Sequence, residues 1–136
     1  MSESILNSTK KILGLDEAYT AFDLDVMMNI NSALSVLTQI GVGPSTGMMI
    51  EDDTADWSLL GTDIRVVNEA KQYIYLAVRA VFDPPSTSYG TEAMKEQIAE
   101  HVWRLNVLME ETIWTDPNPP DPLEEDVDYT FDGGAP

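Results

Sequence analysis

The sequence lacks cysteine and is poor in positive charge, and each deficit excludes classes of function. Without cysteine there is no disulfide, no thiolate nucleophile and no cysteine-bearing metal site, which fits a chain made in a reducing cytoplasm. Seven lysines and arginines stand against 24 aspartates and glutamates, a formal net charge of -17. Because a field of this sign repels phosphate backbones, we expect no sequence-specific binding of nucleic acid.

Motifs that carry chemistry are also missing. The one histidine, His101, has no titratable partner fixed by a motif, and the sequence has neither a phosphate-binding glycine loop nor a pair of metal-binding histidines. The acidic cluster at residues 51–56 lacks the glycine and glutamate that a calcium loop needs, so helix capping explains it more simply. We therefore expect no enzymatic activity, no metal and no cofactor.

Residues 26–50 form an uncharged segment that is long enough to raise the question of a membrane span. Asparagine, serine, glycine and proline interrupt it too often for a hydrocarbon environment, so it predicts a soluble helix followed by a loop. The N-terminus lacks the basic start and apolar run of a signal peptide. We expect no association with a membrane.

Helical periodicity predicts an all-α fold, a small bundle of four to five helices within residues 1–114. Helices are expected over the following stretches: 3–13, 20–40, 55–60, 62–82 and about 89–113. The expected N-caps are Thr20, Asp53 or Thr54, and Thr62 or Asp63, and the expected C-terminal stops are Gly14 and Gly41. Residues 48–50 are apolar and predict one short extended edge segment.

The stretch AKQYIYLAVRAVFDPP, residues 70–85, predicts the central helix of the bundle. Between residues 73 and 82 every face is apolar except at Arg79, so other elements must surround it. Pro84 and Pro85 then end the helix. Arg79 needs an acidic partner or a path to the surface, and we favour a structural ion pair. The predicted structural core consists of Tyr73, Ile74, Val78, Arg79, Phe82 and Trp103.

The predicted helix 20–40 has a back face that is polar but uncharged, made of Asn29, Asn31, Ser32 and Ser35. Such a face is more often simply solvated. Because the cores of protein interfaces are depleted of charge, it also suits contact with another subunit. Both interpretations stay open from sequence alone, with solvent exposure the more common outcome.

Residues 115–136 form an acidic, proline-rich tail with five prolines, seven acids and no base, which we expect not to fold alone. Val127, Tyr129 and Phe131 alternate with polar residues, the period of a strand with one apolar face. We therefore predict a partner-binding segment that adds as a strand, formed by Leu123, Val127, Tyr129 and Phe131. A random acidic tail is the alternative.

Over residues 4–108 the chain resembles the head-tail connector, or adaptor, proteins of tailed bacteriophages. The resemblance is strongest at the FDPP stop of residues 82–85, at MKEQI in 94–98 and at WRLN in 103–106. It implies a virion structural protein in the neck, present in the host cytoplasm during assembly. Its implied partners are the portal protein, copies of itself in a ring commonly of twelve, and the next neck or tail protein.

In such a ring, DNA would pass through an acidic channel without sequence-specific binding. The alternative function is an acidic regulatory protein that mimics DNA and binds a basic partner. Against it, Lys10, Lys11, Lys71 and Arg104 interrupt the acids, which are not laid out as a phosphate-like row.

Overall fold

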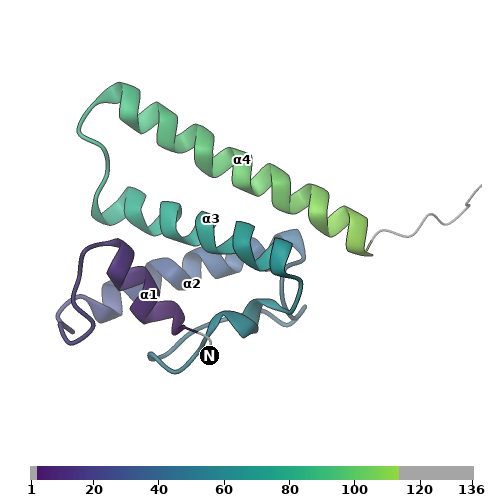
Figure 1. Cartoon of the computed structure of the whole chain (residues 1–136), viewed down its shortest axis with the longest axis horizontal. Coiled ribbons are helices and arrows are strands. Elements are labelled where there is room, and N and C mark those ends of the chain that lie inside the picture. Colours follow the sequence, from purple (N-terminus) through teal and green to yellow (C-terminus); the bar gives the residue numbers. More distant parts are fainter. Residues whose placement is uncertain (1–2, 114–136) are drawn as a thin grey trace, which may run out of the picture.

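The computed structural model describes residues 3–113, and the side chains of residues 3–110. Its elements in chain order are α1 (Ile5–Ile12), α2 (Asp23–Ile40), the 3-10 turn η1 (Trp57–Leu60), α3 (Ile64–Phe82) and α4 (Ser88–Ile113) (Figure 1). The predicted all-α class is therefore confirmed. The extended segment predicted at residues 48–50 forms no strand; these residues belong to the loop between α2 and η1, in which Met48 and Ile50 are buried.

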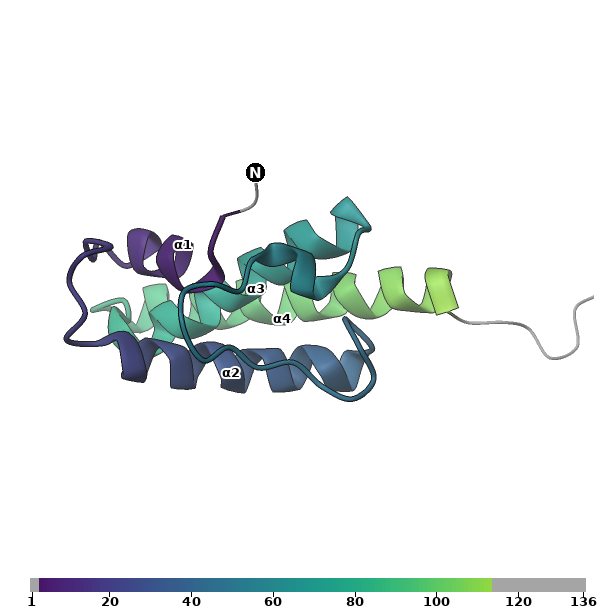
Figure 2. The ribbon, with the colours of Figure 1, turned by 90° about the horizontal axis from the view of Figure 1, so that it is seen from below.

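Helix α3 is the element around which the others pack, as its apolar sequence predicts. It contacts α1, α2, η1 and α4, and Figure 2 shows it between α2 on one side and α1 on the other. Tyr73, Ile74 and Val78 are all buried, which confirms their predicted place in the core. The cover is incomplete at the two ends, where Ile64 and Val81 are exposed.

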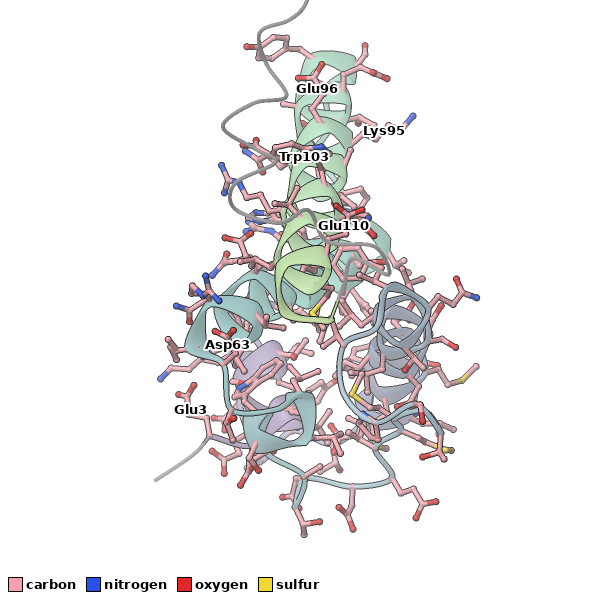
Figure 3. The ribbon with its side chains drawn as sticks, turned by 90° about the vertical axis from the view of Figure 1, so that its right-hand side faces the viewer. Glu3, Asp63, Lys95, Glu96, Trp103 and Glu110 are labelled. Atoms are coloured by element: carbon pink, nitrogen blue, oxygen red, sulfur yellow. The ribbon has the colours of Figure 1, made fainter. Side chains whose placement is uncertain are left out.

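Helix α4 packs against the body along one side only. Leu105 on that side is fully buried, whereas Trp103 is 66% exposed. Figure 3 shows the part of α4 that carries Lys95 and Glu96 farther from the body than the part that carries Glu110. The prediction that Trp103 lies in the core was therefore wrong, because no other described element covers the face of α4 that carries it.

The position of Arg79 also differs from its predicted place in the core. Its side chain is 48% exposed and lies 3.7 Å from Asp83, one turn further along the chain. The expected ion pair exists, but it lies on the surface, because the last turn of α3 is covered on one side only. Phe82, at the end of the helix, is partly buried and packs against the core.

Most helix ends lie where a capping side chain or a glycine favours them. Asp63 accepts a hydrogen bond from the backbone amide of Arg65 at 3.0 Å, and Gly41 ends α2 with a φ of 111°, both as predicted. Thr20 does not cap α2, which begins at Asp23. The cap of η1 is Asp56 rather than Asp53 or Thr54, because its carboxylate accepts from the amide two residues ahead.

Candidate functional site

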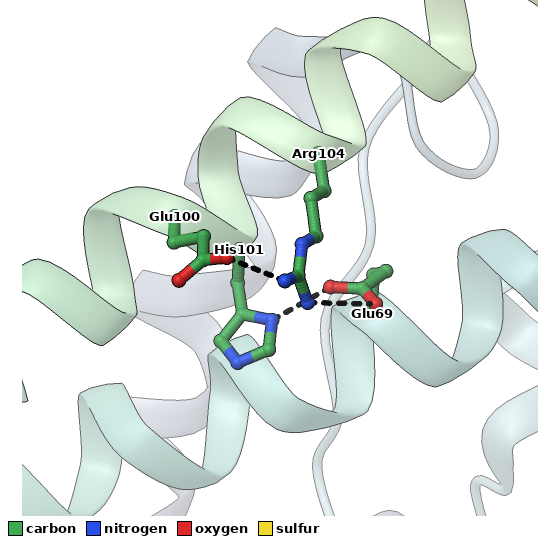
Figure 4. A network of polar contacts seen from close by, with 4 residues as sticks. All are labelled: Glu69, Glu100, His101 and Arg104. Atoms are coloured by element: carbon green, nitrogen blue, oxygen red, sulfur yellow. Dashed lines mark hydrogen bonds and ion pairs between the residues drawn. The ribbon is translucent and has the colours of Figure 1, made fainter.

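No group of three or more histidine or acidic residues between positions 3 and 110 could hold a metal ion. His101 instead joins a polar cluster that links α3 to α4 (Figure 4). Its Nδ1 lies 2.6 Å from Oε1 of Glu69, whose Oε2 lies 3.7 Å from Nη1 of Arg104. Arg104 also pairs with Glu100 on its own helix. These contacts join α3 to α4.

Sequence spacing could not reveal this cluster. Glu69 and His101 lie 32 positions apart in the chain, and only the packing of α3 on α4 brings them together. The one sequence signal was the Glu100 and Arg104 spacing, which places both on one face of a helix.

The polar face predicted on α2 divides into two parts. Asn29 donates to the carbonyl oxygen of Asp25, and Asn31 both donates to the carbonyl oxygen of Ile50 at 3.0 Å and accepts from its amide at 2.7 Å. Asn31 therefore holds the loop against α2. Ser32 and Ser35 are exposed.

Two large apolar residues that sequence reasoning missed extend this exposed face. Leu24 and Met28 are 68% and 62% exposed, and their spacing places them on one stripe with Ser32 and Ser35. We call these four residues the α2 face. The sequence did contain a signal for this exposure, because α2 has more apolar residues than one buried stripe can hold.

A second surface lies where the start of α3 faces the second half of α4. This α3–α4 cleft has a volume of about 430 Å³. Its lining consists of Arg65, Asn68, Glu69, Trp103, Arg104, Val107 and Leu108. It thus brings together two of the seven basic residues of the chain beside an exposed indole ring.

Arg65, which lines the cleft, is paired with Asp63, the N-cap of α3. Asp63 lies 3.1 Å from the Arg65 guanidinium. Hydrogen bonds from the Arg65 side chain and backbone amide hold the pKa of Asp63 below its usual range. Asp63 thus stays ionised beside Arg65 in neutral solution.

The tail residues Leu123, Val127, Tyr129 and Phe131 lie outside the described residues, so their role as a partner-binding segment stays a prediction. Among the described helices, none is both long and apolar enough to cross a membrane.

Comparisons with known proteins point to one family. No curated protein and no solved structure matches the chain significantly. The sequence profile of a family described as phage connector protein matches residues 5–112, from the first residue of α1 to the last turn of α4. This confirms the resemblance seen in the sequence. The chain therefore belongs to the phage connector protein family, a family of structural rather than enzymatic proteins.

Proposed function

We propose that this connector assembles with copies of itself into a ring that docks on the portal protein, extends the DNA channel and offers a platform to the next neck or tail protein. The observation that carries the proposal is the α2 face. On a chain with a net charge of -17, a helix exposes Leu24 and Met28 in line with two serines and with no charged residue among them. Interface cores are depleted of charge in this way.

The acidic surface supports the same function. A channel lined with carboxylates repels the phosphate backbone, so DNA passes without being retained. The DNA-mimic alternative gains no support, because Arg65 and Arg104 meet in one exposed cleft of the body. A mimic of DNA would present a continuous negative surface there.

The ring is tested by placing a like charge on the α2 face. We expect Met28→Glu to lower the number of copies bound per portal, because neighbouring acidic subunits would then bury an unpaired charge. The control is Lys95→Glu, which makes the exposed first half of α4 more acidic and leaves the α2 face unchanged. Electron microscopy of purified particles gives the readout.

Two results would contradict the proposal. The protein could be absent from the neck of intact particles, or Met28→Glu particles could carry the same ring as the control. Circular dichroism of both variants checks that the helical body is folded.

A further inference from the structure

The buried stripes of α1 and α3 both continue past the point where other elements cover them. Ile12 comes three residues after the buried Thr9, so it lies on the face of α1 that packs against the body. Val81 comes three residues after the buried Val78 and lies on the packed face of α3 in the same way. Even so, Ile12 and Val81 are 45% and 62% exposed. The end of α1, the start of α2 and the end of α3 lie at one end of the body, on the left of Figures 1 and 2.

The loop between α1 and α2 adds two aromatic rings to this end of the body. Tyr19 and Phe22 are both exposed, and their rings meet edge to face with centroids 5.9 Å apart. We call Ile12, Tyr19, Phe22 and Val81 the end surface. Exposed apolar side chains gathered in one place mark an interaction site, and aromatic residues are enriched at the cores of protein interfaces.

Hydrogen bonds hold the backbone of the loop that carries the two rings. The amide of Ala18 donates to Oδ1 of Asp16 at 2.9 Å, and the amide of Tyr19 donates to the carbonyl oxygen of Asp16 at 2.9 Å. The buried Lys10 donates to the carbonyl oxygen of Glu17 at 3.0 Å. Because the loop is already ordered, a partner that binds Tyr19 does not have to order it.

The carboxylates beside the end surface specify the charge of its occupant. Asp16 and Glu17 belong to the same loop as Tyr19, and Asp25 lies in the first turn of α2. All three are exposed, and none forms an ion pair with another residue between positions 3 and 110. Carboxylates at the rim of an apolar surface attract a cationic partner and orient it.

The bases at this end of the body do not neutralise these carboxylates. Lys10 pairs with Asp23, and Arg79 pairs with Asp83. Lys11, at the end of α1, is exposed and has no acidic partner among the described residues. One ammonium group therefore stands against three unpaired carboxylates.

A second copy of the chain does not fit this charge. The net charge of -17 makes two copies repel each other. Every lysine and arginine of the chain except Lys11 already contacts an acid or an aromatic ring. Nucleic acid and anionic lipid are repelled by the same carboxylates. The uncharged α2 face suits a copy, whereas the end surface suits a different protein.

We propose that the end surface docks a different protein, through an apolar segment of that protein flanked by lysines or arginines. Tyr19 and Phe22 anchor the contact, and Asp16, Glu17 and Asp25 attract the cationic flanks. The place of this contact in the neck of the particle rests on the proposed function, whereas its chemistry does not. The α2 face begins at Leu24, close to this surface in the chain, so the tests below leave the α2 face unchanged.

The first test uses a helical peptide of leucine and lysine as the probe and the full-length protein as its receptor, with calorimetry as the readout. We expect Tyr19→Ser with Phe22→Ser to weaken binding by about tenfold, because the two rings supply the apolar anchor. The matched control is Ile64→Ser with Trp103→Ser, which removes two exposed apolar side chains outside the end surface and should leave the affinity unchanged. Equal affinity in the anchor variant and the parent chain would overturn the proposal.

Attraction between any acidic protein and any basic peptide needs a control of its own. A peptide of serine and lysine with the same charge should bind about tenfold more weakly than the leucine peptide, because it has nothing to place against the rings. Equal binding of the two peptides would overturn the proposal.

A charge variant tests the carboxylates without touching the rings. Glu17→Gln with Asp25→Asn should lower the affinity for the leucine and lysine peptide by about threefold at low salt. Glu92→Gln with Glu96→Gln removes the same charge from the exposed first half of α4 and should have a smaller effect. Equal effects of the two charge variants would contradict the assigned carboxylates.

Sedimentation velocity of the full-length protein tests a second copy as the occupant. We expect the parent chain and the anchor variant, Tyr19→Ser with Phe22→Ser, to show the same state of association. Self-association that disappears in the anchor variant would show that a copy covers the end surface, and would overturn the proposal. Calorimetry reads the end surface and microscopy of Met28→Glu particles reads the α2 face, so each proposal can fail without the other.

Discussion

The Nζ of Lys10 lies 2.7 Å from Oδ1 of Asp23, and Lys10 is only 1% exposed. The same ammonium donates to the carbonyl oxygen of Glu17 at 3.0 Å. Lys10 therefore joins the last turn of α1 to the connecting loop and to the first residue of α2. The pair also explains why Asp23 is not the partner of a capping box at Thr20, since its carboxylate turns toward the ammonium.

Replacing Lys10 with methionine should lower the free energy of unfolding by about 3 kcal/mol, because Asp23 then keeps its charge without a partner. The loss is at the low end for a buried pair, since Asp23 is 25% exposed and water can reach it. Urea denaturation followed by circular dichroism measures the change. Lys11→Met, at the exposed neighbouring position, is the control and should cost less than about 0.5 kcal/mol. Equal losses in both variants would contradict the role of the pair.

The burial of Lys10 could not be predicted from the sequence. Its position at the end of a short helix correctly indicated a favourable interaction with the helix dipole. Nothing in the spacing indicated that it is buried, because its partners come from a loop and from the next helix. Long side chains with charged ends are rarely buried, so the general expectation pointed the other way.

The helices themselves were largely predictable. Glycine at 41, Asp63 and the double proline after Asp83 mark boundaries by backbone chemistry that acts within a few residues. Trp103 was misplaced because periodicity gives the faces of a helix without showing which faces another element covers. The contact between Glu69 and His101 could not be predicted either, because it depends on how α3 and α4 pack.

A second prediction concerns Asn31, which bonds both backbone groups of the buried Ile50. Asn31→Ala should lower the free energy of unfolding by about 2 kcal/mol, because a buried amide and carbonyl lose their partners. The Ile50 amide should also exchange its hydrogen faster in nuclear magnetic resonance experiments. Ser32→Ala, one residue away and exposed, should leave both measurements unchanged. Slow exchange at Ile50 in the Asn31 variant would show that the loop does not depend on this side chain.

A third prediction concerns the cluster of Glu69, His101 and Arg104. Glu69→Gln removes the charge that faces both partners across α3 and α4, and should cost about 1 kcal/mol of unfolding free energy because the cluster is partly exposed. Glu92→Gln, near the exposed start of α4, should have no measurable effect. The difference between the two variants should shrink in high salt as the ion pairs are screened. A difference that does not respond to salt would mean that shape, not charge, holds the helices together.

The last prediction follows from the low pKa of Asp63, which hydrogen bonds from the Arg65 side chain and backbone amide produce. A carboxyl group whose pKa is lower in the folded state stabilises the fold above its unfolded pKa, and that contribution is lost as the pH falls through the folded pKa. The pH range in which this contribution is lost therefore begins at about pH 4, the ordinary range of aspartate, and extends below it.

Asp63→Asn keeps a capping oxygen but removes the charge. We expect the variant to be less stable than the parent chain above about pH 5, and the two urea midpoints to converge as the pH falls below about 3. Asp53→Asn removes the same charge from the loop before η1 and is the control. A gap between the Asp63 variant and the parent that stays constant down to acid pH would contradict the assignment, because the ionised form of Asp63 would then contribute nothing to the cap of α3.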